Sequence, residues 1–379
     1  MTAVVTELLG LILTPGGWLR GTLTHEAGRI VALRGEAASD EAWRDGALPI
    51  LLPGFIDLHV HGGGGADTMQ AGTAIDTIAR THARHGTTAL LATTMTAPRD
   101  EIEAALRALA SSCTTRSEGA ARVLGVHLEG PYISPDKLGA QPAFAVTPSV
   151  AEILALHAIA PICVVTLAPE LPSALQTTAA LVAAGIRVQI GHSAASYEEA
   201  RAALGAGASG FTHLFNAMSG LHHRAPGAAG AALAHAEHAE LIPDLLHVHP
   251  GAMRAALRAI PGLYCVTDAT AAAAMPDGEY RLGRHEVHKC GGGVRLADGT
   301  LAGSTLTMDQ ALRNLVEGLG LGLPEASQRV STHAAQYLGL ADRGTLRAGA
   351  WADIVMLDAR LRLHQVFVEG QGIDVADAH

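Results

Sequence analysis

Residues 51–62 read LLPGFIDLHVHG, and this stretch guides the interpretation of the rest of the chain. Pro53 and Gly54 mark a break, and the short apolar run that follows has the length of a buried strand. His59 and His61 lie two residues apart, so in a strand both side chains point to the same face. Two imidazoles that meet at a strand end suit a divalent transition metal, although an isolated pair is as often two ordinary surface or core histidines.

The middle of the chain alternates apolar, strand-like runs with alanine-rich helical segments. Strands are predicted near residues 51–61, 87–94, 123–129, 162–168, 187–192, 210–215, 241–248 and 263–268. Helices are predicted near residues 71–85, 99–112, 148–158, 172–184, 195–206, 250–259, 305–320 and 324–338. Repeated strand–helix units imply a parallel sheet, and eight of them suggest a closed (β/α)8 TIM-like barrel with its active site at the carboxyl ends of the strands.

The two ends of the chain differ from its middle. Residues 1–50 and 340–379 contain short apolar runs separated by glycine-containing turns, which predicts short strands. We expect these ends to pair into one small β-sandwich domain, while residues 51–339 form the barrel. The glycine-rich segment 277–302 suggests a β-hairpin inserted after the eighth barrel strand. The predicted fold class is therefore α/β, a barrel with a second domain built from both termini.

The composition limits the classes of partner. With 26 basic and 36 acidic residues the net charge is −10, which argues against nucleic acid or an anionic membrane as the main partner. The four cysteines are far apart and form no CxxC motif, so we expect reduced thiols and a cytoplasmic protein. Neither a secretory signal nor an uninterrupted apolar run of about 18 residues is evident, so no membrane span is expected.

Polar residues end several of the predicted strands. They are Glu129 in HLEGP, His192 in GHS, His213 and Asn216 in THLFNAM, His247 in PDLLHV, and Asp268 in TDAT. Any one of them alone could be a hydrogen-bonded core residue. Because the carboxyl ends of barrel strands form a single rim, we expect them to converge.

The types of these residues suggest metal-dependent hydrolysis. Glu129, His192 and His213 supply one carboxylate and two imidazoles, a common catalytic set for Zn²⁺ or Fe²⁺ with an open position. His59 and His61 could complete a second site, with Glu129 bridging the two. A bound metal lowers the pKa of water toward ~7, which makes a metal-bound hydroxide nucleophile available at neutral pH.

Asp268 is a lone carboxylate on the strand opposite these ligands. It could act as general base toward the attacking water and then as general acid toward a leaving amine. A role as a further metal ligand is the competing interpretation, and the two roles are compatible.

Six motifs in this order resemble the amidohydrolase superfamily and, within it, the N-acetylglucosamine-6-phosphate deacetylases. They are PGFIDLHVHG, HLEGP, GHS, THLFNAM, TDAT and LAGSTLTM. The resemblance covers nearly the whole chain, including ADRGTLRAGAWADIVMLD near the C-terminus. It implies hydrolysis of the acetamide of N-acetyl-D-glucosamine 6-phosphate to D-glucosamine 6-phosphate and acetate, in amino-sugar catabolism or the recycling of cell-wall sugars.

The resemblance also implies roles for individual residues. Glu129, His192 and His213 match the main metal ligands, and Asp268 matches the catalytic acid and base. One or two divalent ions are implied, Zn²⁺ first, with Fe²⁺, Co²⁺ or Mn²⁺ as alternatives. The positions that match substrate contacts are Ala140, Gln141, Asn216, Ala217, Arg224, His247, Ala302, Gly303 and Ser304.

Two of these substrate positions carry further expectations. Arg224 matches an arginine that binds the substrate phosphate, often across a dimer interface, so we expect a homodimer. Gln141 stands where some members have histidine. Its neutral amide can donate a hydrogen bond to the acetyl oxygen, but it carries no charge, so we expect weaker oxyanion stabilisation.

Two other functions stay open at this point. An aminoacylase-like or dihydroorotase-like hydrolase on the same scaffold commonly uses a lysine as bridging ligand, and no predicted strand here ends in lysine. A scaffold protein without catalytic activity is the third possibility, and the complete set of ligand-type residues together with Asp268 argues against it.

Overall fold

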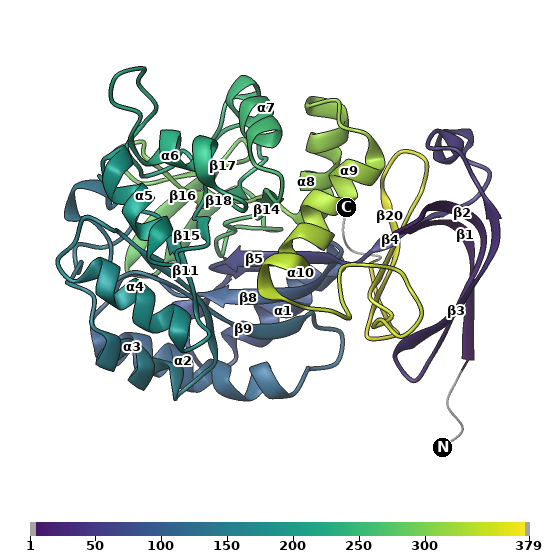
Figure 1. Cartoon of the computed structure of the whole chain (residues 1–379). Helices are drawn as coiled ribbons and strands as arrows, with labels where there is room; N and C mark the ends of the chain where they lie inside the picture. The colour runs from purple at the N-terminus through teal and green to yellow at the C-terminus, as the bar shows by residue number, and fades with distance from the viewer. Residues whose placement is uncertain (1–4, 376–379) are drawn as a thin grey trace.

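The computed structural model describes residues 5–375 of the chain, which form two parts (Figure 1). One part is a barrel of alternating strands and helices. The other is a β-sheet domain in which the first strands of the chain lie beside the last ones. Residues 1–4 and 376–379 of the predicted terminal domain lie outside the described residues.

Eight parallel strands build the barrel. They are β5 (Phe55–Val60), β8 (Thr87–Thr93), β9 (Arg122–Glu129), β10 (Ile162–Leu167), β11 (Arg187–Ile190), β12 (Gly210–Phe211), β13 (Glu240–Leu241) and β14 (Tyr264–Cys265). Six form one sheet in the order β12-β11-β10-β9-β8-β5, and β13 pairs with β14. Backbone hydrogen bonds join these two sheets at both seams, from Leu214 N to Glu240 O (2.9 Å) and from Asp268 N to His59 O (3.0 Å). The predicted barrel is confirmed.

Every residue of β5 and β8 is buried, as expected for strands of a parallel sheet with both faces covered. The predicted strand 51–61 is wrong in one respect, because it divides at Gly54. Residues before it form β4 (Ile50–Pro53) in the terminal sheet, and residues after it form β5 in the barrel. A Cβ atom at Gly54 would lie 2.3 Å from the Thr88 side chain, so only glycine fits this crossing between the two sheets.

The predicted strands 210–215, 241–248 and 263–268 are shorter than expected. His213, Leu245 and Asp268 have φ angles of 28°, 66° and 51°, and a strand cannot continue through this left-handed region. The segments that follow β12, β13 and β14 are therefore loops at the rim of the barrel.

Ten α-helices lie within the described residues. They are α1 (Ala74–Arg84), α2 (Arg99–Thr114), α3 (Val150–His157), α4 (Ala174–Ala183), α5 (Tyr197–Gly205), α6 (Gly227–His235), α7 (Pro250–Ala259), α8 (Met308–Arg313), α9 (Leu323–Ser327) and α10 (His333–Leu338). Short 3-10 turns lie at η1 (Ala42–Asp45), η2 (Thr68–Gln70) and η3 (Pro135–Lys137). Two segments are π-helical: η4 (Asn314–Gly318) continues α8, and η5 (Gln328–Thr332) joins α9 to α10. Helix α6 was not predicted, since its sequence GAAGAALAH has no polar stripe and its first six residues are buried.

The terminal domain is one seven-stranded sheet in the order β21-β20-β19-β4-β1-β2-β3. Besides β4, its strands are β1 (Val5–Thr14), β2 (Gly17–Glu26), β3 (Arg29–Ala37), β19 (Ile354–Leu357), β20 (Leu363–Val368) and β21 (Gln371–Ile373). Strand β19 pairs antiparallel with β4, which joins the two ends of the chain as predicted. Where we expected a β-sandwich, these strands thus form one continuous sheet. The terminal domain has a separate buried cluster that includes Leu23, Leu51 and Ile354.

A four-stranded antiparallel sheet follows β14, where the sequence suggested a hairpin over residues 277–302. Its strands are β15 (Gly278–Leu282), β16 (His285–Cys290), β17 (Gly293–Arg295) and β18 (Leu301–Ser304). Near the tip of this insert the Gly283 N–H donates to Asp67 (2.9 Å), which ends the short hairpin of β6 (Gly62–Gly63) and β7 (Ala66–Asp67). Among residues 5–375, no helix combines the length and apolar character needed to cross a lipid bilayer.

Candidate active site

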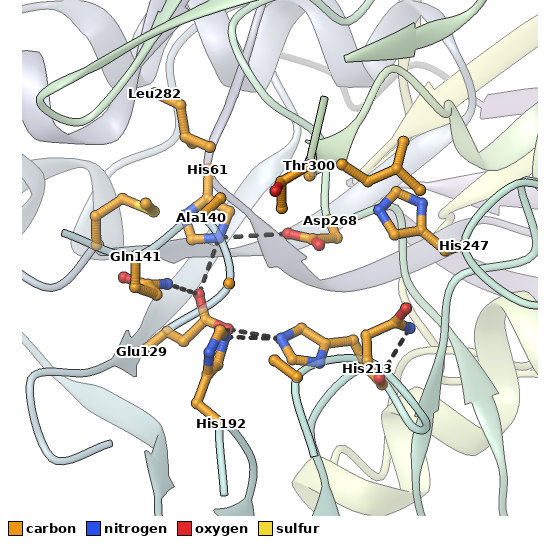
Figure 2. A pocket seen from close by; sticks show the side chains of 16 residues that line it. His61, Glu129, Ala140, Gln141, His192, His213, His247, Asp268, Leu282 and Thr300 are labelled. Carbon is orange, nitrogen blue, oxygen red and sulfur yellow. Dashed lines mark hydrogen bonds and ion pairs between the residues drawn. The ribbon is translucent and has the colours of Figure 1, made fainter. Parts of the chain in front are cut away.

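Ligand-type side chains from different barrel strands converge on Glu129, the last residue of β9 (Figure 2). Its Oε1 lies 3.2 Å from His192 Nε2 and 3.0 Å from His213 Nε2, and these two nitrogens are 3.1 Å apart. All three side chains are almost fully buried. The structure therefore brings Glu129, His192 and His213 together, as the sequence predicts.

The backbone turns sharply at the two histidines. His192 and His213 have φ angles of 45° and 28°, in a region that residues other than glycine rarely adopt. The turns direct both Nε2 atoms at the same carboxylate oxygen. Unfavourable φ angles of this kind concentrate at functional sites, where the surrounding packing maintains them.

A second group lies on the other side of Glu129. The Nε2 atoms of His59 and His61 are 3.2 Å apart, and Asp268 Oδ1 lies 3.4 Å from the first and 3.3 Å from the second. Glu129 Oε2 faces this group, 3.1 Å from His61 Nε2 and 3.5 Å from His59 Nε2. The two oxygens of one carboxylate therefore face two separate ligand sets.

These donor sets fit divalent ions. Within each set, donor atoms about 3 Å apart surround a common point, which suits metal–ligand bonds of ~2.0–2.2 Å to nitrogen and oxygen. The Nδ1–H of His192 donates to Lys137 O (2.8 Å), so its Nε2 presents a free lone pair to the site. Neutral imidazoles with carboxylates match the preferences of Zn²⁺, Fe²⁺ and related ions.

The charges of the site also favour a cation. Burial alone would raise the pKa of Glu129, but the charge of His59 and the close contacts with His192 and His213 outweigh it and hold this pKa well below its ordinary value. Burial likewise would lower the pKa of His61, but hydrogen bonds to Asp268 and Glu129 raise it to about 9. Carboxylates that stabilise an extra proton on an imidazole also stabilise a metal ion at the same place.

A pocket of about 210 Å³ opens above the two donor sets. Six of the predicted substrate positions line it: Ala140, Gln141, Asn216, Ala217, His247 and Gly303. Ala302 and Ser304 do not line it and are buried in β18. Arg224 does not line it either, because it lies on an exposed loop where its guanidinium donates to His223 Nε2 (2.7 Å).

Gln141 is held at both ends of its side chain. Its Nε2 donates to Glu129 Oε2 (2.6 Å), and its Oε1 accepts from the Thr96 N–H (2.7 Å). One of the two amide hydrogens is thus committed to Glu129. The predicted hydrogen bond to a substrate carbonyl therefore has only the second hydrogen on Nε2 available to it.

His247 is the imidazole that enters the pocket from the loop after β13 (Figure 2). Its Nδ1 bonds to Asp244 Oδ2 (2.6 Å), and Asp244 Oδ1 accepts the backbone N–H of His247 (2.9 Å). Burial lowers the pKa of His247, but Asp244 outweighs this effect and raises it above its ordinary value. The structure thus places at the pocket wall an imidazole whose protonated form is stabilised by Asp244.

Sequence reasoning missed several residues of the site. Met95 and Leu282 form apolar parts of the pocket wall, and nothing in their local sequence distinguishes them from core residues. Glu240, in β13, is fully buried against His59. One signal in the sequence could have identified Glu240: it directly precedes the apolar run LIP of a predicted strand. A carboxylate is rarely buried unless it is paired, so an acidic residue at a buried strand indicates a partner nearby.

Known proteins resemble this chain over most of its length. The amidohydrolase family pattern matches residues 50–374. N-acetylgalactosamine-6-phosphate deacetylase of Escherichia coli O157:H7 is 42% identical over 367 residues, which cover 95% of this chain and 97% of that protein. N-acetylglucosamine-6-phosphate deacetylase of Lysinibacillus sphaericus is also 42% identical, over 86% of each chain.

A solved structure adds a bound substrate to the comparison. An aspartate-to-alanine variant of N-acetyl-D-glucosamine-6-phosphate deacetylase from Mycobacterium smegmatis, in complex with N-acetyl-D-glucosamine 6-phosphate, superposes with a TM-score of 0.89. That protein is 33% identical, and the match covers 98% of this chain and 100% of the other.

Proposed function

The chain belongs to the amidohydrolase family, and from that membership we propose that it hydrolyses the acetamide of N-acetyl-D-glucosamine 6-phosphate. The products are D-glucosamine 6-phosphate and acetate. The observation that carries this proposal is the position of Glu129 between two ligand sets, with Asp268 beside them, at the floor of a pocket sized for a small substrate.

Metal binding is assigned to residues whose geometry suits it. Glu129, His192 and His213 would hold one divalent ion, and His59 and His61 would hold a second together with Asp268. We place Zn²⁺ first because nitrogen and carboxylate donors with an open position are its common catalytic environment. When bound, the ion lowers the pKa of water toward ~7 and polarises the acetyl carbonyl.

Asp268 moves the proton in this proposal. It takes a proton from the attacking water and transfers it to the nitrogen that leaves as the amine. Its N–H donates to His59 O (3.0 Å) and its own carbonyl accepts from the Ser304 N–H (2.8 Å), so its backbone is held on both sides. The φ angle of 51° is one that aspartate tolerates better than most residues.

Recognition of the phosphate is assigned to His247 and Arg224. His247 lines the pocket with its imidazole held by Asp244, which suits binding of an anion. Arg224 lies outside the pocket of its own chain, on an exposed loop that also contains Leu221, three positions earlier and 60% exposed. We propose that Arg224 reaches the phosphate in a second copy of the chain, which makes the active form a homodimer.

The second candidate substrate is N-acetyl-D-galactosamine 6-phosphate. The Escherichia coli relative named for that epimer is 42% identical over 95% of this chain, and the Lysinibacillus relative named for the glucosamine compound has the same identity. A dihydroorotase-like or aminoacylase-like activity is disfavoured, because the bridging position is a glutamate.

We also propose a cytoplasmic location, which is supported by four cysteines with free thiols: Cys113, Cys163, Cys265 and Cys290.

A substrate panel tests the proposal. The purified protein is supplied with Zn²⁺ and assayed for acetate release from both N-acetylhexosamine 6-phosphates, from unphosphorylated N-acetylglucosamine and from an N-acetylated amino acid. Two charge-assisted contacts to phosphate, at about 1.5–3 kcal/mol each, predict a kcat/KM at least ~100-fold higher for the phosphorylated sugars. Equal activity on the unphosphorylated sugar, or a preference for the amino acid, would exclude the proposed substrate class.

A further inference from the structure

Glu240 is a carboxylate buried inside the barrel, below the candidate metal ligands and outside the lining of the pocket. Its Oε2 accepts from His59 Nδ1 (2.9 Å) and from the backbone N–H of His213 (3.2 Å). Its Oε1 accepts from the Tyr264 hydroxyl (3.4 Å). One side chain therefore contacts members of both ligand sets without facing the space where substrate binds.

The contact determines which nitrogen of His59 carries the proton. A carboxylate only accepts hydrogen bonds, so Nδ1 is the protonated nitrogen and donates to Glu240. The lone pair of Nε2 is then directed at His61 and Asp268, which lie 3.2 and 3.4 Å away. Carboxylates in this position orient metal-binding histidines and increase their basicity.

Glu240 is itself held in place by a chain of hydrogen bonds across the barrel interior. Gln189 Nε2 donates to the Tyr264 hydroxyl (2.6 Å), which donates to Glu240. The Thr212 hydroxyl donates to Gln189 Oε1 (2.9 Å) and bonds to the Thr166 hydroxyl (2.8 Å). These residues come from or directly follow five barrel strands and are all buried. Burying a carboxylate costs free energy, and here several hydrogen bonds offset that cost and fix the side chain in one position. Such an arrangement indicates that the position of Glu240 serves a function.

We propose that Glu240 is a positioning residue: its hydrogen bond to Nδ1 orients His59 as a ligand of the second ion proposed above. The ion at Glu129, His192 and His213 should depend on Glu240 much less, because the hydrogen bond from Glu240 to that set is to the backbone N–H of His213 and not to a ligand atom. This inference rests on the metal dependence proposed above but not on the identity of the substrate.

The test measures metal binding directly. Metal-free wild type, Glu240→Gln and Glu240→Leu are titrated with Co²⁺, and bound metal is followed by the absorption of the ion and by elemental analysis. Glu237→Gln is the matched control, since it is the same substitution at an exposed position three residues away. No substrate is present, so an error in the proposed substrate leaves the result intact.

The wild type and Glu237→Gln should bind two ions per chain. In Glu240→Gln the dissociation constant of the second ion should rise 10–100-fold while that of the first changes less than threefold. Glu240→Leu should bind one ion. If this variant does not fold, the dissociation constant of the second ion in Glu240→Gln tests the proposal. One ion in the wild type, an unchanged second constant in Glu240→Gln, or equal weakening of both ions would each overturn the proposal.

Discussion

Replacing Asp268 by asparagine removes its basicity and keeps its shape. Asparagine tolerates the φ angle of 51° as well as aspartate does, and the backbone hydrogen bonds to His59 and from Ser304 do not depend on the side chain. We therefore expect a folded variant with the amide where the carboxylate was. Alanine would not provide this control, because it tolerates the left-handed backbone less well.

The expected loss follows from the proposed role. General acid–base catalysis typically contributes 10²–10⁴-fold, so kcat should fall by that factor, which is about 2.7–5.4 kcal/mol in the barrier. The loss should appear in kcat more than in KM, because the proton moves only during the reaction. Acetate release at saturating N-acetylglucosamine 6-phosphate measures it, with metal content determined on the same preparation.

One alternative cause must be separated from this effect. Asp268 Oδ1 lies 3.3 and 3.4 Å from the Nε2 atoms of His61 and His59, so the variant can also lose an ion there. His61→Ala is the comparison, because it weakens the same ion and leaves the carboxylate. A kcat of Asp268→Asn within threefold of wild type would refute the role of Asp268, and an equal loss in His61→Ala would assign the effect to the metal contact instead.

Three further predictions concern acid stability, phosphate binding and metal removal. Burial would raise the pKa of Glu369, but Arg122 and Arg343 outweigh it and lower this pKa to about 2. The ion pairs of Glu369 therefore stabilise the fold above pH ~4.5, and this stabilisation is lost as the pH falls toward 2. Glu369→Gln should lower the free energy of unfolding in urea by about 1–3 kcal/mol at pH 7, and this difference from wild type should shrink below pH 4. A difference that grows on acidification would contradict this sign. In Asp244→Asn, His247 loses the partner that raises its pKa, so KM for the phosphorylated sugar should rise about tenfold, most strongly above pH 7, with kcat changed less than threefold; an unchanged KM would remove His247 from phosphate binding. Chelation should abolish activity and lower the melting temperature by about 3 °C, since a ligand at 100 times its Kd stabilises by about 2.7 kcal/mol, and added Zn²⁺ should restore both.

The sequence was sufficient for the barrel and for the main ligand sets because both depend on periodic patterns. Alternating strands and helices place the carboxyl ends of strands together, so the sequence alone predicts that Glu129 and His192 meet. The spacing of His59 and His61 predicted two side chains on one face, and their Nε2 atoms are 3.2 Å apart.

What the sequence did not reveal depends on contacts without local pattern. Glu240 acts through His59, 181 positions away in the chain, and no spacing rule connects the two. Helix α6 has no polar face, so its periodicity carries no signal. Strand β12 ends two residues before the left-handed backbone angle at His213, and β13 ends four residues before the one at Leu245; neither residue type predicts such an angle.

The strand pairing of β19 with β4 has a consequence for how the polypeptide is made. Ile354 sits opposite Pro53, so about 300 residues must leave the ribosome before this edge of the sheet is covered. During that interval β4 presents unpaired backbone groups to any other nascent chain nearby. A stop codon placed just before residue 354 would leave the barrel strands intact in sequence while keeping that edge permanently open, and the product should accumulate in inclusion bodies.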